Sequence, residues 1–217
     1  MPKAESTIGI GIDGDTERRI LHAARTVFIR RGTAGARMQE IAEEAGVNQA
    51  LLHYYFRTKE RLAATVFREA AARLLPAVMG VFSSDAPLPT KIEQFVHVYI
   101  DTVRESPFLP GYVVSEMHHH PERLKAMLDS AGVEPAPIVA RLRNKLGSEL
   151  SALAESGEIR SISPEQFLLN MIGLVVIPFV ARPMLGLVLG LDDPQFARLL
   201  DERRKMLPQM ILNSLRP

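Results

Sequence analysis

Apolar side chains recur every three or four positions along most of the chain, which is the pattern of amphipathic helices. The first stripe runs from Ile20 to Phe28, and the second, from Met38 to Ala45, has the spacing i, i+3, i+4 and i+7. A third, shorter stripe contains Leu52 and Phe56, and longer ones continue almost to the C-terminus. No segment alternates convincingly with the period of a β-strand, so the sequence predicts an all-α fold.

The N-terminal residues 1–14 contain isolated glycines and show no helical period, so they are predicted to form a flexible arm. The first helix is expected to begin near Asp15 or Thr16, since either side chain can cap the first free amides. It is expected to end at Gly32, which can adopt the left-handed conformation of a helix C-cap.

Proline and capping residues divide the rest of the chain into helices. Pro76 is expected to end or kink the helix that contains it. Capping patterns at Thr90, Ser163 and Asp193 predict the starts of three more helices. The helix that starts at Ser163 is apolar nearly all round and is expected to reach about Leu185.

Residues 38–59 join two short helices through a turn of about three residues. Gly46 can stop the first helix in a left-handed conformation, Val47 can pack inward, and Asn48 can cap the second helix. This is the spacing of a helix-turn-helix, whose second helix enters a DNA major groove. The positions left outward on that second helix are Gln49, Ala50, His53 and Tyr54.

Charge is distributed unevenly along the chain. The net charge is only +1, but Arg18 to Arg61 contains nine Lys or Arg and four Glu, which gives this segment +5. A basic N-terminal part on a mildly acidic remainder is expected if one end of the molecule contacts phosphate.

Other chemistries find little support. The chain has no Cys, which excludes disulfides, thiolate metal sites and a Cys nucleophile. It has no Gly-rich phosphate loop, GxSxG or HExxH motif, so we do not expect an enzyme or a cofactor. Adjacent histidines on a helix point about 100° apart, so His118, His119 and His120 are not expected to bind one metal ion.

One stretch, Met171 to Leu191, is nearly all apolar. It contains Arg182, Pro178 and Pro183, and a central Arg is costly in a membrane. We therefore expect a buried helix or an oligomer interface there rather than a membrane span. No secretory signal is visible, and a cytoplasmic protein is expected.

Three motifs between Arg18 and Leu62 together resemble the DNA-binding head of the TetR family of transcriptional regulators. They read RRILHAARTVFIRRG, IAEEAGV and LHYYFRTKERL. The resemblance implies a helix-turn-helix domain at 15–62 and a larger helical domain at 63–217 for effector binding and dimerisation. His53 replaces the usual Tyr, Ala50 and Leu51 differ from the usual small residue and Thr, and Ala36 and Arg37 occupy the usual Ser or Thr cap position.

On this basis we assign roles to the residues of the head. Gln49 and Ala50 are the expected base contacts, because Gln pairs with adenine and Ala touches a thymine methyl. Arg37 and Gln39 are flanking candidates, and Tyr55 fits both a core and a contact position. We assign contacts with DNA phosphates, which position the head without reading the base sequence, to His53, Tyr54, Thr58 and Lys59. Asn48 completes the set of predicted DNA-binding residues.

The family architecture also implies an effector cavity and a dimer interface in the second domain. Candidate lining residues for a small, largely apolar effector are Phe95, His97, Tyr99, Phe108, Tyr112, Met117, His118, Phe167 and Asn170. Candidate interface residues on the last two long helices are Ile172, Val176, Phe179 and Phe196.

The sequence therefore predicts a homodimeric DNA-binding regulator that a small molecule releases from a palindromic operator. We expect the regulator to repress transcription, although the sequence does not distinguish a repressor from an activator. The alternative is a helical ligand sensor or adaptor whose head does not bind DNA specifically.

Overall fold

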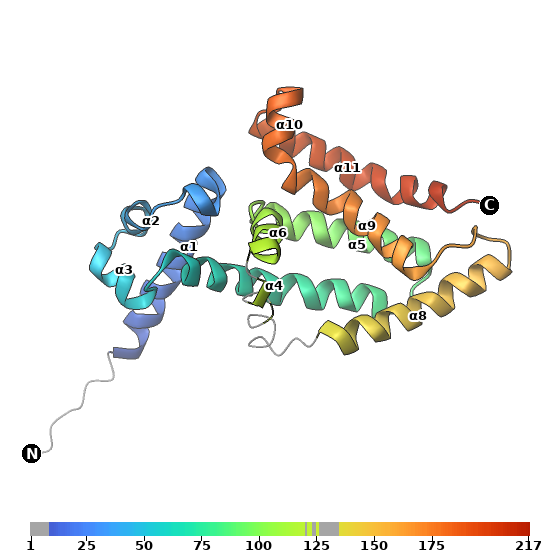
Figure 1. Ribbon diagram of the computed structural model, residues 1–217, viewed down its shortest axis with the longest axis horizontal. Helices are drawn as coiled ribbons and strands as arrows, with labels where there is room; N and C mark the ends of the chain where they lie inside the picture. The colour runs from blue at the N-terminus through green and yellow to red at the C-terminus, as the bar shows by residue number, and fades with distance from the viewer. Residues whose placement is uncertain (1–8, 120, 123–124, 126–134) are drawn as a thin grey trace, which may run out of the picture. The chain divides into compact units, whose positions relative to one another are not determined.

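The computed structural model describes residues 9–119, 121–122, 125 and 135–217, and every regular element within them is an α-helix (Figure 1). The predicted all-α fold is confirmed. Two compact units are distinguished, Met1–Glu69 and Ala70–Pro217. Their division lies within one long helix, C-terminal to the boundary that the sequence suggested after Leu62.

The N-terminal unit is a helical head with a fully apolar core. It contains α1 (Gly9–Gly35), α2 (Met38–Ala45), α3 (Gln49–Tyr55) and the first part of α4 (Lys59–Ser83). Ion pairs join α1 to α2 at the surface, with Arg30 Nη2 2.7 Å from Glu44 Oε2. The core residues, none more than 5% exposed, include Ile20, Ala24, Val27, Phe28, Ile41, Leu52, Phe56, Leu62 and Val66.

In the described part of the C-terminal unit, the remainder of α4 packs with six further helices. These are α5 (Leu88–Arg104), α6 (Leu109–His119), α8 (Pro135–Glu155), α9 (Pro164–Val180), α10 (Arg182–Leu189) and α11 (Asp193–Ser214). The guanidinium of Arg204 on α11 donates to both carboxylate oxygens of Asp101 on α5. Its Nε lies 3.0 Å from Oδ1 and its Nη2 lies 3.0 Å from Oδ2. Nearly inaccessible side chains in its core include Ile92, Ile100, Leu150, Phe167, Met171, Leu207 and Leu215.

Helix α1 begins earlier than the sequence suggested. It starts at Gly9 rather than near Asp15, so residues 9–14 belong to a helix and not to an arm. Residues 1–8 lie outside the described part. The expected break at Gly32 is present, with φ 66° and ψ 167°, although helical residues resume up to Gly35.

Pro76 was expected to end or kink its helix, and it does not end α4, which continues to Ser83. This corrects the expected helix end. A proline inside a helix costs about 3 kcal/mol, since it removes one hydrogen bond and crowds the preceding turn. Here the ring is exposed, whereas Val81 and Phe82 beyond it are buried and Val78 packs on the core. Burial of these side chains offsets the local penalty.

Helix α5 starts at Leu88, and Pro87 occupies its N-cap position. The helix start predicted from the capping pattern at Thr90 is therefore wrong. A proline at the first helical turn needs no amide partner, and the Leu88 side chain is 3% exposed. Because Leu88 is buried, the helix begins at Leu88, before Thr90.

The long apolar helix expected from Ser163 is divided. Ser163 caps α9 as predicted, its hydroxyl accepting the amide of Gln166 at 3.2 Å. The chain bends by 66° between α9 and α10, and Pro183, which has no amide hydrogen, lies in the first turn of α10. Within the described residues no single helix is long and apolar enough to cross a membrane, and only this bent pair passes by length and composition.

The cap of the last helix lies one residue before the predicted one, and the helix begins at Asp193. Asp192, rather than Asp193, accepts the amide of Gln195, and the Gln195 side chain in turn accepts the amide of Asp192. This reciprocal capping box fixes the start of α11.

Candidate nucleic-acid interface

The turn between α2 and α3 has the geometry that the sequence predicted. Gly46 has φ 63° and ψ 37°, the left-handed region in which a side chain is strained. The amide of Val47 donates to the carbonyl of Ala42 at 3.0 Å, which closes the end of α2. Asn48 then caps α3, because its side-chain oxygen accepts the amide of Leu51 at 2.7 Å. The end of α2 and the start of α3 are therefore both satisfied by bonds within the turn.

Burial separates the inner and outer faces of this helix pair. Ile41, Ala42 and Ala45 of α2 and Leu52 of α3 are buried. Tyr55 is half-buried, and its ring meets that of Tyr54 edge-on with centroids 5.4 Å apart. The outward residues that sequence reasoning selected on α3 are all exposed, namely Gln49, Ala50, His53 and Tyr54. The structure therefore brings the predicted base-contact residues onto one free surface.

His53 is tied to the end of its own helix. Its Nδ1 lies 3.2 Å from the carbonyl oxygen of Arg57. A carbonyl only accepts, so Nδ1 carries the proton in this contact. The imidazole can then donate to a phosphate only through Nε2–H, which requires the imidazolium form.

Lys59 has two partners within the head. Its ammonium donates to the carbonyls of Ala34 at 2.9 Å and Ala36 at 3.1 Å, at the end of α1 and in the connector to α2. These two bonds were not predicted for Lys59, which was expected to contact phosphate. They could have been predicted, because the last carbonyls of a helix lack helical partners and Lys side chains often donate to them. Thr58 caps α4, accepting the amide of Arg61 at 3.2 Å.

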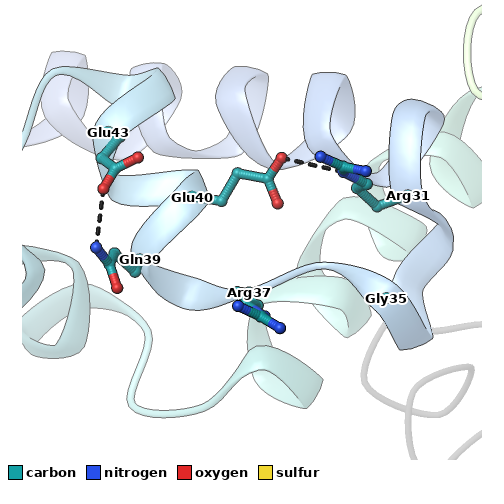
Figure 2. A pocket seen from close by; sticks show the side chains of 6 residues that line it. All are labelled: Arg31, Gly35, Arg37, Gln39, Glu40 and Glu43. Carbon is teal, nitrogen blue, oxygen red and sulfur yellow. Dashed lines mark hydrogen bonds and ion pairs between the residues drawn. The ribbon is translucent and has the colours of Figure 1, made fainter.

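A hollow of about 460 Å³ lies where α1 turns into α2 (Figure 2). Arg31 bonds to Glu40 across it, and Gln39 donates to Glu43 at 3.0 Å. Arg37 occupies the N-cap position of α2 with an extended backbone and makes no side-chain capping bond. Figure 2 shows its guanidinium apart from the other lining side chains. Arg37 thus presents a cation beside the first amides of α2, where helix geometry favours an anion.

The predicted effector residues differ widely in burial. Phe95 packs in an aromatic row, its ring centroid 5.3 Å from that of Phe82 and 6.1 Å from that of Tyr99. Burial raises the pKa of the Tyr99 hydroxyl. Tyr112 is buried, His97 and Phe108 are half-buried, and Met117 and His118 are exposed.

Two of the predicted effector residues, Phe167 and Asn170, do line a common hollow of about 360 Å³. It extends from α9 to α11 and to the segment before α9. The remaining lining residues include Arg160, Ile162, Leu169, Gly173, Leu174, Met210, Ile211, Ser214 and Leu215.

The histidines at the end of α6 bond to their own helix. Nδ1 of His118 and of His119 lie 2.8 and 2.9 Å from the carbonyl oxygens of Val114 and Ser115. His120 is outside the described residues. Among those described, no cluster of His, Cys, Asp or Glu is arranged to hold a metal ion.

The predicted dimer residues fall into two groups. Phe179 and Phe196 are 4% and 5% exposed and pack against each other in the core of one chain. The guanidinium of Arg182 lies over the Phe196 ring at 5.1 Å. Phe179 continues the buried i, i+4 row of Phe167, Met171 and Val175 on the inner face of α9. Phe179 and Phe196 are therefore core residues of one chain and not surface residues as the sequence suggested. Ile172 is 49% exposed, and Val176 is half-buried.

Comparisons with known proteins agree on the head and on the fold. Residues 20–66 match the sequence profile described as bacterial regulatory proteins, tetR family. The chain is 26% identical over 156 residues to the HTH-type transcriptional regulator BetI of Rhizobium meliloti (strain 1021), covering 71% of this chain and 73% of BetI. It is 33% identical over 91 residues to the HTH-type transcriptional regulator RutR of Escherichia coli (strain K12), covering 42% of each.

A solved structure has the same fold. The hemolysin II transcriptional regulator HlyIIR superposes with a TM-score of 0.58 at 22% identity, covering 94% of this chain and 99% of HlyIIR. At that identity the match describes the fold alone. The curated relatives are named as regulators and not as enzymes, in agreement with the absence of catalytic motifs.

Proposed function

We propose that this chain, a transcriptional regulator of the tetR family of bacterial regulatory proteins, is a ligand-responsive repressor. Regulators of this family bind DNA and typically act as dimers with small-molecule effectors. In the proposal, a cytoplasmic homodimer binds a palindromic operator, and a small, largely apolar effector releases it. The observation that carries the proposal is the α2–turn–α3 pair with its buried inner face and its exposed Gln49 and Ala50.

The head contacts DNA through two kinds of residue in this proposal. Gln49 and Ala50 read base edges from the N-terminal end of α3, with Arg37 and Gln39 beside them. The phosphate contacts are assigned to Asn48, His53, Tyr54, Thr58 and Lys59. Asn48 can cap α3 and contact a phosphate at the same time, because capping uses its side-chain oxygen and leaves its amide NH2 to donate.

Exposed apolar residues of the C-terminal unit support the homodimer. Ile172 and Ile177 on α9 are 49% and 58% exposed, and Met206 on α11 is 50% exposed. Contiguous exposed apolar surface marks an interaction site, and a twofold interface buries the same patch on both copies. Two heads then occupy successive major grooves, about 34–36 Å apart.

We propose a site for the effector from the chemistry of the residues that line it. The hollow beside Phe167 and Asn170 combines an aromatic ring with one amide, the combination that binds a largely apolar molecule and orients it. An effector that binds better to a dimer with the wrong head spacing shifts the population away from DNA.

The test is a binding titration with the upstream region of the gene and a matched set of single-base variants. Gln49→Ala is expected to weaken preference at one base position by about 1–3 kcal/mol. Gln94→Ala, an exposed Gln on α5, is the matched control and should leave the preference profile unchanged. Equal loss of affinity on every sequence would refute base reading by Gln49.

A second candidate function has a specific observation in its favour. Two assigned phosphate contacts, His53 and Lys59, already bond to backbone carbonyls of the head. A sensor or adaptor without specific DNA binding fits that arrangement. It predicts that the upstream region and an unrelated duplex of equal length bind equally over a range of salt concentrations, whereas the repressor prefers the upstream region.

A further inference from the structure

The hollow between α9 and α11 has an apolar floor. Three of its lining side chains are buried, those of Phe167, Ile211 and Leu215, and none of them is more than 3% exposed. Phe167, Asn170 and Leu174 are spaced by three and four residues, so they lie on one face of α9. Between Phe167 and Leu174 the helix rises by roughly 10 Å, which leaves room along it for an extended small molecule.

Arg160 is the one charged side chain that lines this hollow among the described residues, and no Asp or Glu does. Arg160 is exposed, but its backbone amide donates to the carbonyl of Leu215 at 2.8 Å, which fixes its place beside the end of α11. In the described part of the chain its guanidinium has neither a carboxylate nor a carbonyl partner. Other arginines of the same unit are paired, for example Arg104 with Asp201. Arg160 therefore brings an unpaired positive charge to an apolar hollow.

The polar groups of the hollow differ in the bonds that they can still make. The Ser214 hydroxyl donates to the carbonyl of Ile211 at 2.7 Å, so its hydrogen is already used. Among the described lining residues, the side chains with N–H donors are Arg160 and Asn170. A guanidinium attracts an anion more strongly beside apolar walls than in open water, because the local dielectric constant is lower. The hollow thus offers donors and a positive charge to a ligand that carries acceptors and a negative charge.

The single cation also selects the kind of anion. A planar guanidinium matches a carboxylate, to which it donates two parallel hydrogen bonds. A phosphate monoester carries about −1.5 to −2 charges at neutral pH, so one guanidinium leaves it only partly neutralised. A carboxylate carries one negative charge, which the charge of Arg160 balances.

We propose that this hollow binds a small molecule with an apolar body and a carboxylate head. The body lies against Phe167, Ile211 and Leu215. The carboxylate pairs with Arg160, and the Asn170 amide is a second donor. A volume of about 360 Å³ is within the range of small-molecule sites, about 300–1,000 Å³. The inference rests on the effector site proposed above and names the charge of its ligand.

Octanoate and octan-1-ol test the carboxylate, because they share one apolar chain and differ in the head group. Calorimetric titration of the full-length protein is expected to show tighter binding of octanoate. Arg160→Met should weaken octanoate binding about tenfold or more and leave octan-1-ol binding unchanged. Arg160→Lys keeps the charge and should recover part of the loss. Arg198→Met removes an exposed arginine of α11 outside the hollow, and this matched control should bind octanoate as the wild type does.

Gly173→Leu tests the location of the site. Gly173 lines the hollow, and a Cβ atom added to it would meet no atom within 4 Å, so a larger side chain can enter the hollow without a clash in one chain. The variant should therefore bind octanoate about tenfold or more weakly. Gly80→Leu is the matched control, since Gly80 is an exposed glycine inside α4 with the same free space. Circular dichroism verifies that both variants fold, and unchanged octanoate binding by Gly173→Leu overturns the site.

The outcomes separate this inference from the proposed repressor. Equal affinity for octanoate and octan-1-ol, with no effect of Arg160→Met, overturns the carboxylate head and leaves an apolar effector site standing. No binding of octanoate at millimolar concentration overturns the inference. DNA binding is a separate measurement. If octanoate binds at Arg160 and the affinity for the upstream region stays the same, the ligand class stands and the effector role of the hollow is overturned.

Discussion

At the scale of single residues, Lys59 shows how one side chain serves the fold of the head. Its ammonium lies between the carbonyls of Ala34 and Ala36, where the terminal carbonyls of α1 lack helical partners. The Ala36 side chain is 3% exposed, so this connector is part of the core of the head. Lys59 therefore holds the chain that leads directly into Arg37 and α2. Its third N–H is left for the proposed phosphate contact.

Replacement of Lys59 should thus affect stability as well as DNA binding. Lys59→Met leaves two carbonyls without this donor and is expected to lower the free energy of unfolding by about 1–3 kcal/mol, measured by denaturant titration. If the ammonium also contacts phosphate, the slope of log affinity against log salt should fall by about 1.

Arg37→Ala is the control for the Lys59 substitution. The Arg37 side chain is exposed and makes no capping bond, so its loss should weaken DNA binding and leave the unfolding midpoint unchanged. Full stability of Lys59→Met would show that the two carbonyl bonds do not support the head.

At the scale of elements, the turn between α2 and α3 is the most constrained part of the head. Gly46 is left-handed, and the carbonyl and amide groups around it are paired within the turn. A side chain at this position strains the backbone, so any relief rotates α3 and moves Gln49.

Gly46→Ala is therefore expected to destabilise the protein by about 1–2 kcal/mol and to weaken operator binding. Gly80→Ala is the contrasting control, because Gly80 lies inside α4 without a positive φ and with free space around it. That change should stabilise the protein by about 0.4–1 kcal/mol. Thermal unfolding of both variants measures the difference, and equal midpoints would contradict the assigned strain.

At the scale of the whole molecule, charge pairs attach α8 to the other helices of the C-terminal unit. Lys91 on α5 is 2% exposed, and its Nζ lies 2.5 Å from Oε2 of Glu149 on α8. One turn earlier on α8, Lys145 donates to Asp85 and to the carbonyl of Ser83, and this hydrogen bond lowers the pKa of Asp85. The buried pair is the more consequential, because a buried charge without a partner is costly.

Glu149→Leu should leave the Lys91 ammonium buried and unpaired, at a cost of about 3–5 kcal/mol in the free energy of unfolding. The double variant Lys91→Met with Glu149→Leu should recover most of that loss, since well-packed apolar groups can replace a buried pair. Arg143→Leu is the control on the same helix. It removes an exposed contact to Glu165 of 3.8 Å and should change stability by about 0–1 kcal/mol. Equal losses for the single and double variants would contradict this role.

The sequence alone determined the features that depend on residues close together in the chain. Gly46 and Asn48 form the turn and cap as predicted, because both act through bonds to residues within five positions. Helical periodicity likewise placed Ile41, Ala42, Ala45 and Leu52 in the core, since one face of an amphipathic helix must be buried.

Tertiary structure decided what depends on residues distant in the chain. Helix α4 continues through Pro76 because side chains beyond it are buried, and Phe179 is buried because the inner face of α9 packs on its own chain. Lys59 bonds to carbonyls more than twenty positions away, which no local pattern encodes. Apolar character predicted that α9 needs cover on every side. Only the fold separates the buried side, with Met171 and Val175, from the exposed side, with Leu169 and Ile177, because burial is a property of packed elements and not of sequence spacing.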